Sequence, residues 1–225
     1  MNNWDIRKIA IVEADDFQDR YDRNGLNFLF YWKAKCPNFR ITLFTIPEKT
    51  SQVFKQLMDQ VHWIEIATHG FNHESNVECY GWDYDIAKTL LERTQKQWSW
   101  KDHPYSRVFK SPGWAITPNF NGYPSAPEDP ISKDPQAVYK ALKDMDYIIL
   151  DRHYNKTVRP EGCKIVCVDC NPSIVHMHTW NMMTPNENER NGFEQVEIRG
   201  VPWNNSTIFY TISEAWEKEL FNKCI

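Results

Sequence analysis

Two histidines four residues apart are the clearest metal-binding signal in this sequence. His69 and His73 flank Gly70-Phe71-Asn72, and in a helical turn their Cβ atoms would lie about 5–6 Å apart on one face, close enough to share an ion. Imidazole nitrogens bind zinc, cobalt, nickel or iron. The spacing also arises by chance, with one histidine filling a core or ending a turn, so the pair indicates a metal site only together with a further ligand.

Two adjacent carboxylates can supply that ligand. Asp15 and Asp16 follow the buried apolar run 8–14, where both cannot be desolvated cheaply, so one is expected to hold a metal while the other takes a proton. Two histidines and one carboxylate leave coordination positions open for water and substrate, as a catalytic divalent site requires. The alternative is an ordinary solvated turn at a strand end, where Asp is common.

The elements that must position these residues alternate along the chain. Short apolar runs predict strands at 8–14, 40–46, 63–67, 107–110, 147–150, 164–168 and 173–178, and helical spacing predicts helices at 53–61, 86–94 and, after the start signal Asp134-Pro135, 138–145. This alternation predicts a parallel sheet. About seven strands favour a distorted or incomplete β/α barrel, with an open doubly wound sheet as the alternative.

The candidate polar residues all follow predicted strands. Besides the aspartates and the histidine pair, Lys110 ends one strand and His178 ends the last. The carboxyl ends of parallel strands form the edge where α/β folds keep their active sites. We therefore expect one catalytic site at this edge.

Taken in chain order, these residues resemble the short motifs of the NodB-homology polysaccharide deacetylases, carbohydrate esterase family 4. The resemblance implies a distorted β/α barrel that removes an acyl group from an amino sugar with one divalent ion, most often zinc. It identifies Asp15 as the catalytic base. It also identifies Asp16, His69 and His73 as the metal ligands.

A further motif of the family is similar to the segment 109–114. In the family this Arg-Pro-Pro-Tyr type loop orients the base and lends a backbone N–H to the oxyanion, a role that would fall to Gly113, with Trp114 beside it. Lys110 stands in place of the arginine. Lysine keeps the positive charge but lacks the planar fork that pairs with a carboxylate through two hydrogen bonds.

The family's last motif resembles the run 173–178. By this resemblance His178 protonates the leaving amine, and His176 occupies the place of a leucine that lines the pocket. Alternation along a strand puts both imidazoles on one face, so either can reach the cavity. Other positions depart from the family: Glu13-Ala14 replaces Thr-Phe, Phe17 replaces Gly, and Asp151-Arg152-His153 only hints at the fourth motif.

Composition narrows the function classes. The 225 residues include 26 Lys and Arg and 30 Asp and Glu, a net charge of −4 without a basic run, which argues against a nucleic-acid partner. The N-terminus enters an apolar run without a signal-like or membrane-spanning segment, so we expect one cytoplasmic domain over 1–225 with a long Pro-rich loop at about 115–134. The six cysteines are expected to be reduced thiols.

Three functions remain open from the sequence. The first is hydrolysis of an N-acyl group such as acetyl, with an O-acyl group as the less favoured alternative, on a cytosolic nucleotide-linked or lipid-linked sugar precursor of a surface polysaccharide such as lipopolysaccharide O-antigen. The second is amide formation or acyl exchange at the same metal site, and the third is a noncatalytic sugar-binding module. The spacing of Cys163, Cys167 and Cys170 matches an iron–sulfur loop, but these cysteines run through a predicted strand and are better explained as core thiols.

Overall fold

A computed structural model of the chain describes residues 9–18, 29–30, 32–51, 61–98, 106–117, 134–152, 158–178 and 205–222. The chain divides into two units. The first unit holds Met1–Thr45, Lys49–Ile66 and Pro172–Leu220, and the second holds Ile46–Glu48, Ala67–Asn171 and Phe221–Ile225. Strand β3 (Ile64–His69) passes from the first unit into the second.

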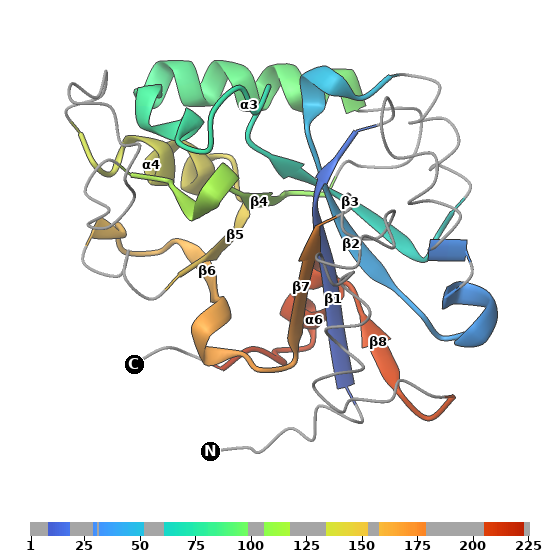
Figure 1. The fold of residues 1–225 in the computed structure, drawn as a ribbon. Coiled ribbons are helices and arrows are strands. Elements are labelled where there is room, and N and C mark those ends of the chain that lie inside the picture. The colour runs from blue at the N-terminus through green and yellow to red at the C-terminus, as the bar shows by residue number, and fades with distance from the viewer. Residues whose placement is uncertain are drawn as a thin grey trace, which may run out of the picture. The chain divides into compact units, whose positions relative to one another are not determined.

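Strand β1 (Ile9–Phe17) is the centre of the first unit. It pairs in parallel with β2 (Ile41–Thr45), β7 (Ile174–His178) and β8 (Ile208–Tyr210), and β1 lies between β2 and β7 (Figure 1). Residues 10–15 of β1 are all buried, as expected for a central strand of a parallel sheet. Helix α6 (Ile212–Glu217) follows β8 and begins with a capping box between Thr211 and Glu214.

The second unit continues the sheet from the end of β3. Strand β3 pairs with β4 (Val108–Lys110), β4 with β5 (Ile148–Asp151) and β5 with β6 (Lys164–Cys167), all in parallel. Helices α3 (Tyr84–Trp98) and α4 (Ala137–Asp144) pack against each other (Figure 1). Their apolar faces join the strands in one core, which includes Leu91, Phe109, Leu142, Tyr147 and Ile149. Short 3-10 turns are η1 (Pro47–Lys49), η2 (Glu78–Gly81), η3 (Pro112–Trp114) and η5 (Val168–Cys170).

The strand order identifies the fold class. The path is β6-β5-β4-β3-β2-β1-β7, with β8 added on β1. Each strand from β2 to β6 lies beside its predecessor in sequence, and β7 returns to β1, as the last strand of a closing barrel does. A doubly wound sheet would reverse direction at a switch point. The predicted incomplete β/α barrel is therefore confirmed and the doubly wound alternative is wrong.

Most predicted elements are present with shifted ends. Strands β1 and β3 extend further than expected and include Asp15, Asp16 and His69 themselves. Helix α4 starts at Ala137 because Asp134 uses its carboxylate to accept the N–H of Gln136 in the preceding turn (2.9 Å). The short strand β8 was not predicted. The helix predicted at 53–61 and the Pro-rich loop fall almost wholly outside the described residues.

The cysteines differ in part from the prediction. Cys36, Cys79, Cys163 and Cys167 are free thiols, but Cys170 is disulfide-bonded. The expectation of reduced thiols is therefore wrong for Cys170. Because that sulfur is already bonded, Cys163, Cys167 and Cys170 do not form a three-thiolate iron–sulfur site.

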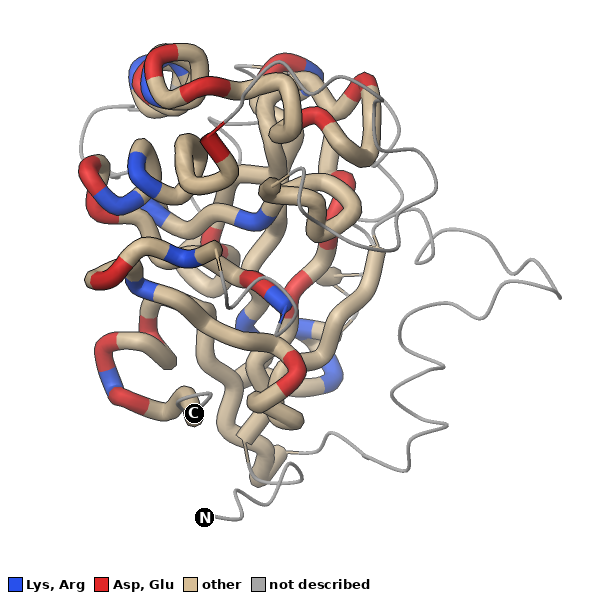
Figure 2. Tube along the Cα trace, turned by 90° about the vertical axis from the view of Figure 1, so that its left-hand side faces the viewer, with Lys and Arg blue, Asp and Glu red and all other residues tan. Residues whose placement is uncertain are grey.

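Charged residues are mixed along the described chain. Figure 2 shows Lys and Arg interspersed with Asp and Glu, in keeping with the charge pattern of the sequence. Among the described residues, no helix combines the length and apolar character needed to cross a lipid bilayer.

A buried ion pair at the end of β5 should dominate the local stability. Asp151, 1% exposed, accepts hydrogen bonds from Tyr139 Oη (2.6 Å) and Arg159 Nε (2.9 Å). Asp151→Ala leaves the Arg159 guanidinium in its pocket without this partner, so we expect a loss of about 3–5 kcal/mol in the free energy of unfolding. Lys140→Ala, which removes the exposed pair with Asp134, should cost under about 1 kcal/mol. Denaturant unfolding of both variants measures the difference, and equal losses would contradict it.

Candidate functional site

His69 ends strand β3 with its imidazole orientation fixed. The side chain is 2% exposed, and its Nδ1 lies 3.0 Å from the carbonyl oxygen of Lys110 on the neighbouring strand β4. A carbonyl only accepts hydrogen bonds, so Nδ1 carries a proton, and in the neutral imidazole Nε2 is then the nitrogen that can bind a metal. Metal-binding histidines are commonly held this way, with the second ring nitrogen donating to a backbone carbonyl.

His73 reaches His69 through a reversal of the backbone. The ring centroids lie 5.1 Å apart, so the predicted proximity of the pair is observed within the second unit. The helical turn considered as one way to bring the pair together is not formed: Gly70 has a φ of 62° and His73 a φ of 48°, and the segment between them is a bend. Left-handed residues at both ends of the segment bring the imidazoles together in place of helical spacing.

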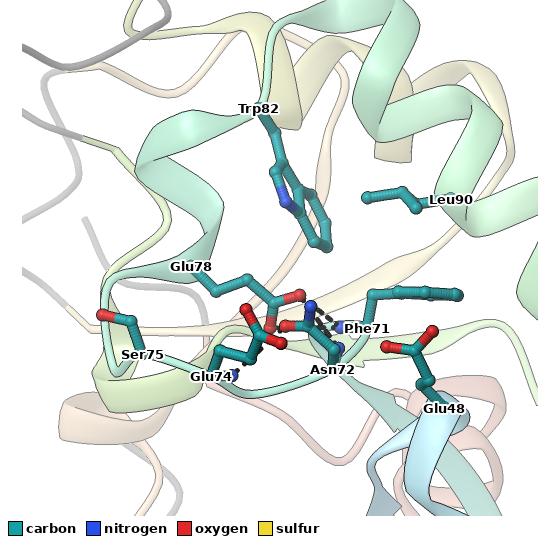
Figure 3. Close-up of a pocket in the computed structure, with 8 residues that line it drawn as sticks. All are labelled: Glu48, Phe71, Asn72, Glu74, Ser75, Glu78, Trp82 and Leu90. Atoms are coloured by element: carbon teal, nitrogen blue, oxygen red, sulfur yellow. Dashed lines mark hydrogen bonds between the residues drawn. The ribbon is translucent and has the colours of Figure 1, made fainter.

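Glu78 holds this reversal in place. Its carboxylate accepts the backbone N–H groups of Phe71 (3.0 and 3.2 Å), Asn72 (3.0 Å) and His73 (3.0 Å), which Figure 3 shows in part. Burial raises the pKa of the Glu78 carboxyl, and the three backbone hydrogen bonds oppose this shift. Nothing in the sequence marks this residue, because no motif identifies a carboxylate that binds backbone N–H groups five to seven residues before it in the chain.

Gly70 makes room for that carboxylate. A Cβ at this position would lie 2.3 Å from Oε2 of Glu78 and 2.8 Å from Cγ of Pro112. The glycine is thus required by both its positive φ and this close approach. Gly70 and Glu78 form one structural device that positions His73.

A pocket of about 380 Å³ adjoins this loop on the side that carries Glu78 (Figure 3). Trp82 and Leu90 lie on one side of it, and Asn72, Glu74 and Glu48 lie on the other. Arg93 sits over the ring of Phe71 (4.9 Å from its guanidinium carbon to the centroid) and 4.0 Å from Glu48. Because Glu48, Glu74 and Glu78 all line it, the pocket is acidic.

Lys110 and Trp114 contact each other in the second unit. Lys110 is fully buried, and its Nζ lies 3.9 Å from the centroid of the Trp114 ring, a cation–π contact. The Arg152 guanidinium lies 5.6 Å from the same ring. Gly113 and Trp114 both adopt positive φ, 58° and 61°. Glycine takes this conformation freely, so the backbone strain in the turn after β4 lies at Trp114, next to the position expected to offer a backbone N–H to an oxyanion.

The aspartate pair lies in a β-bulge of the first unit. The register between β1 and β2 shifts between Ala14 and Phe17, and Asp16 has a φ of 63°. Bulges re-aim side chains and often occur beside active sites. Here the bulge turns Asp16 out of the regular alternation, while Asp15 stays 3% exposed and is the register partner of His178 on β7.

His176 and His178 meet at the same strand ends. Their ring centroids lie 4.8 Å apart, which confirms the expectation that both imidazoles share one face. Nδ1 of His176 lies 2.7 Å from Oε1 of Glu13, and its Nε2 lies 4.0 Å from Oδ2 of Asp15. Glu13 is fully buried. Glu13 and His176 both stand out in the sequence as departures from the family pattern, but no sequence signal predicts their contact.

The fourth motif has a structural role in the described residues. Asp151 binds Tyr139, Arg159 and the N–H of Arg152 (2.8 Å), so its oxygens are used in stabilising the end of β5. His153 lies outside the described residues.

Each unit thus assembles its own share of the predicted site residues. The first brings together Asp15, His176 and His178, with Asp16 beside them in the bulge, and the second brings together His69 and His73. The predicted ligand set of Asp16, His69 and His73 draws on both units and stays a prediction.

Replacing Gly70 should lower the free energy of unfolding more than replacing a glycine whose only close neighbour is a flexible side chain. At Gly162, which also has positive φ (80°) but faces only the flexible Lys143 side chain at 3.2 Å, alanine should lower the free energy of unfolding by about 1–2 kcal/mol through backbone strain. Gly70→Ala should lose about 1–3 kcal/mol more, because its Cβ collides with Glu78 and Pro112. Chemical denaturation compares the two, and a Gly70→Ala loss no larger than that of Gly162→Ala would contradict the close approach.

Glu78→Gln should destabilise the loop of residues 71–73 and leave the rest of the fold unchanged. The glutamine has one acceptor oxygen, so an NH2 group must face at least one of the N–H groups of residues 71–73, at a cost of about 1–3 kcal/mol. Amide hydrogen exchange should then accelerate at residues 71–73 and remain unchanged in β4 and β5. Unchanged exchange in the loop would show that Glu78 does not hold it.

No family model and no curated protein matches the sequence, but solved structures do. The Xyl-CE4 domain of a multidomain xylanase from the hindgut metagenome of Trinervitermes trinervoides aligns with a TM-score of 0.52 at 15% identity, covering 97% of this chain and 94% of that one. A family 4 acetyl xylan esterase from Clostridium thermocellum, solved with a cobalt ion, aligns with a TM-score of 0.55 at 11% identity, covering 96% and 93%.

A mutant of a CE4 family pseudoenzyme aligns with a TM-score of 0.52 at 12% identity, covering 93% of this chain and 67% of that one. Because active and inactive proteins share this architecture, the likeness assigns no activity by itself. It does agree with the strand order. The chain therefore has the fold of the family 4 carbohydrate esterases, the NodB-type incomplete β/α barrel.

Proposed function

We propose that this chain is a metal-dependent deacylase that hydrolyses the N-acetyl group of an amino sugar. The observation that carries the proposal is the fixed orientation of His69: Nδ1 is bound to the Lys110 carbonyl, and the second imidazole, His73, lies 5.1 Å away between ring centroids. A buried histidine held in this tautomer beside another histidine is the arrangement of a metal-binding edge. The matching fold supports the same assignment.

Asp16 is proposed as the third ligand of one divalent ion, zinc in the first place, with cobalt, nickel or iron as alternatives. Two imidazoles and one carboxylate form a donor set that suits these ions and leaves positions open for water and substrate. When bound, such an ion polarises the acyl carbonyl and lowers the pKa of water.

The proton transfers are assigned to this chain's own side chains. Asp15 takes the proton of the attacking water, the N–H of Gly113 donates to the oxyanion, and His178 protonates the departing nitrogen. The balance is one water consumed, the carbon–nitrogen bond broken, and acetate and a free amine released. Lys110 supports the oxyanion side through its positive charge, and Trp114 and His176 line the substrate position.

The substrate is proposed to be a soluble or lipid-linked sugar precursor of a surface polysaccharide such as lipopolysaccharide O-antigen, handled in the cytoplasm. The aspartates, histidines and aromatic side chains suit a polar sugar ring with one acyl group. Amide formation at the same site and noncatalytic sugar binding are the outcomes that the following test separates from hydrolysis.

Acetate release from N-acetylated sugar nucleotides tests the proposal. Zinc- or cobalt-loaded wild type should release acetate, a chelator should abolish the activity, and His69→Ala/His73→Ala should lose both the ion and the activity. Asp15→Asn should lower kcat by about 10²–10⁴-fold, as expected for loss of a general base. His62→Ala, at an exposed histidine outside the candidate site, is the matched control and should behave as wild type.

Three results would contradict hydrolysis. Full activity in Asp15→Asn would remove the assigned base. A metal-loaded protein that forms an amide when an amine donor is supplied, but releases no acetate, would favour the amide-forming alternative. Binding of N-acetylated sugars without turnover would favour the noncatalytic one.

A further inference from the structure

The first unit holds a second group of metal-ligating side chains. Asp15, His176 and His178 each offer one ligand atom, and these atoms all lie within 4.8 Å of one another. His178 is the register partner of Asp15 across β1 and β7, and His176 precedes it by two residues on the same face. The geometry points to a binding site for a divalent transition-metal ion at these three residues, distinct from the ion proposed at Asp16, His69 and His73.

Glu13 gives this group an outer carboxylate. Its Oε1 lies 2.7 Å from Nδ1 of His176, and a carboxylate accepts hydrogen bonds, so Nδ1 donates. In the neutral imidazole Nε2 is then the nitrogen with a free lone pair, and it lies 4.0 Å from Oδ2 of Asp15. A carboxylate that fixes the tautomer of a histidine whose other nitrogen binds the ion is the common outer arrangement of zinc sites.

The distances suit a small closing movement. Zinc binds nitrogen and oxygen ligands at about 2.0–2.2 Å, which places tetrahedral ligand atoms about 3.4 Å apart. The observed limit of 4.8 Å is wider, but rotation of the half-buried imidazoles about their side-chain bonds covers the difference. Two imidazoles and a carboxylate select zinc, cobalt, nickel or iron over magnesium or calcium, which prefer oxygen ligands.

Charge gives a reason for the ion. Glu13 is fully buried and Asp15 is 3% exposed, with Asp16 next to it on the same strand. Buried carboxylates are costly unless a positive charge is near. A divalent ion bound at Asp15, His176 and His178 would place positive charge beside these carboxylates.

Occupation of the site has a functional consequence, and this consequence rests on the proposed function. Asp15 and His178 are the proposed proton carriers of the deacylation. An ion bound to both would take them out of proton transfer. The second ion would therefore inhibit the enzyme when metal is in excess, so the chain would be active with one ion and inactive with two.

Metal stoichiometry tests the site without using activity. Metal-free full chain is titrated with Zn²⁺ by calorimetry, and the ions retained per chain are counted by elemental analysis. The key variant is Glu13→Thr/His176→Leu, which restores the threonine and leucine of the family pattern and so leaves no buried carboxylate without its imidazole. Glu13→Gln, His69→Ala/His73→Ala and the control His62→Ala complete the set, each checked for folding by its unfolding transition.

We expect two ions per chain in wild type and in His62→Ala, and one in Glu13→Thr/His176→Leu. Glu13→Gln should keep two ions but bind one of them about 10–100-fold more weakly, because the outer carboxylate is lost. Cobalt bound to His69→Ala/His73→Ala should give the visible absorption of a site with nitrogen and oxygen ligands, and the spectrum should vanish when His176 is also replaced.

Two outcomes would overturn the site: a wild type that binds a single ion and loses it in His69→Ala/His73→Ala, or a Glu13→Thr/His176→Leu variant that still binds two. If instead His69→Ala/His73→Ala keeps both ions while Glu13→Thr/His176→Leu loses one, the metal centre of the proposed function fails and the second site stands.

Discussion

Desolvation of charged side chains is the constraint on which both units depend. Glu13, Lys110 and Asp151 are 0%, 0% and 1% exposed, although each belongs to a residue type that is almost never fully buried without a partner. Every one has a specific contact: an imidazole at 2.7 Å, a tryptophan ring at 3.9 Å, and a guanidinium at 2.9 Å. Charged side chains can be buried at the strand ends because these contacts offset the loss of hydration.

Backbone strain collects at the same strand ends. In the part of the chain that the structure describes, five residues other than glycine have positive φ, and three of them follow or end a sheet strand: Asp16, His73 and Trp114. The other two, Asp146 and Glu219, directly follow helices α4 and α6, where a left-handed residue is ordinary. A φ of 61° is costly for a tryptophan. Such strain persists only where surrounding contacts fix the backbone conformation. At the loop that carries His73 these contacts come from Glu78, whose carboxylate accepts three backbone N–H groups.

How much of the structure could be predicted from the sequence depended on how far apart along the chain the interacting residues are. The strands, their alternation with helices and the placement of polar residues at strand ends follow from short apolar runs, so the fold class could be predicted. The proximity of His69 and His73 was predicted for the wrong reason, since spacing suggested a helix where Gly70 and His73 reverse the chain. Glu78 could not be found, because its partners are backbone groups and leave no residue signature. The pairing of Glu13 with His176 joins positions 163 apart, and only the register of β1 with β7 reveals it.

That pairing explains how two departures from the family pattern fit together in the first unit. A lone Thr to Glu replacement in a central strand would bury a carboxylate without the imidazole that contacts it here, at a cost of several kcal/mol. A lone Leu to His replacement on β7 would leave the imidazole without this carboxylate. Glu13 and His176 are direct register partners on β1 and β7, and Nδ1 of His176 donates to Oε1 of Glu13 at 2.7 Å. Each replacement therefore offsets the cost of the other, and together they place a polar pair beside Asp15.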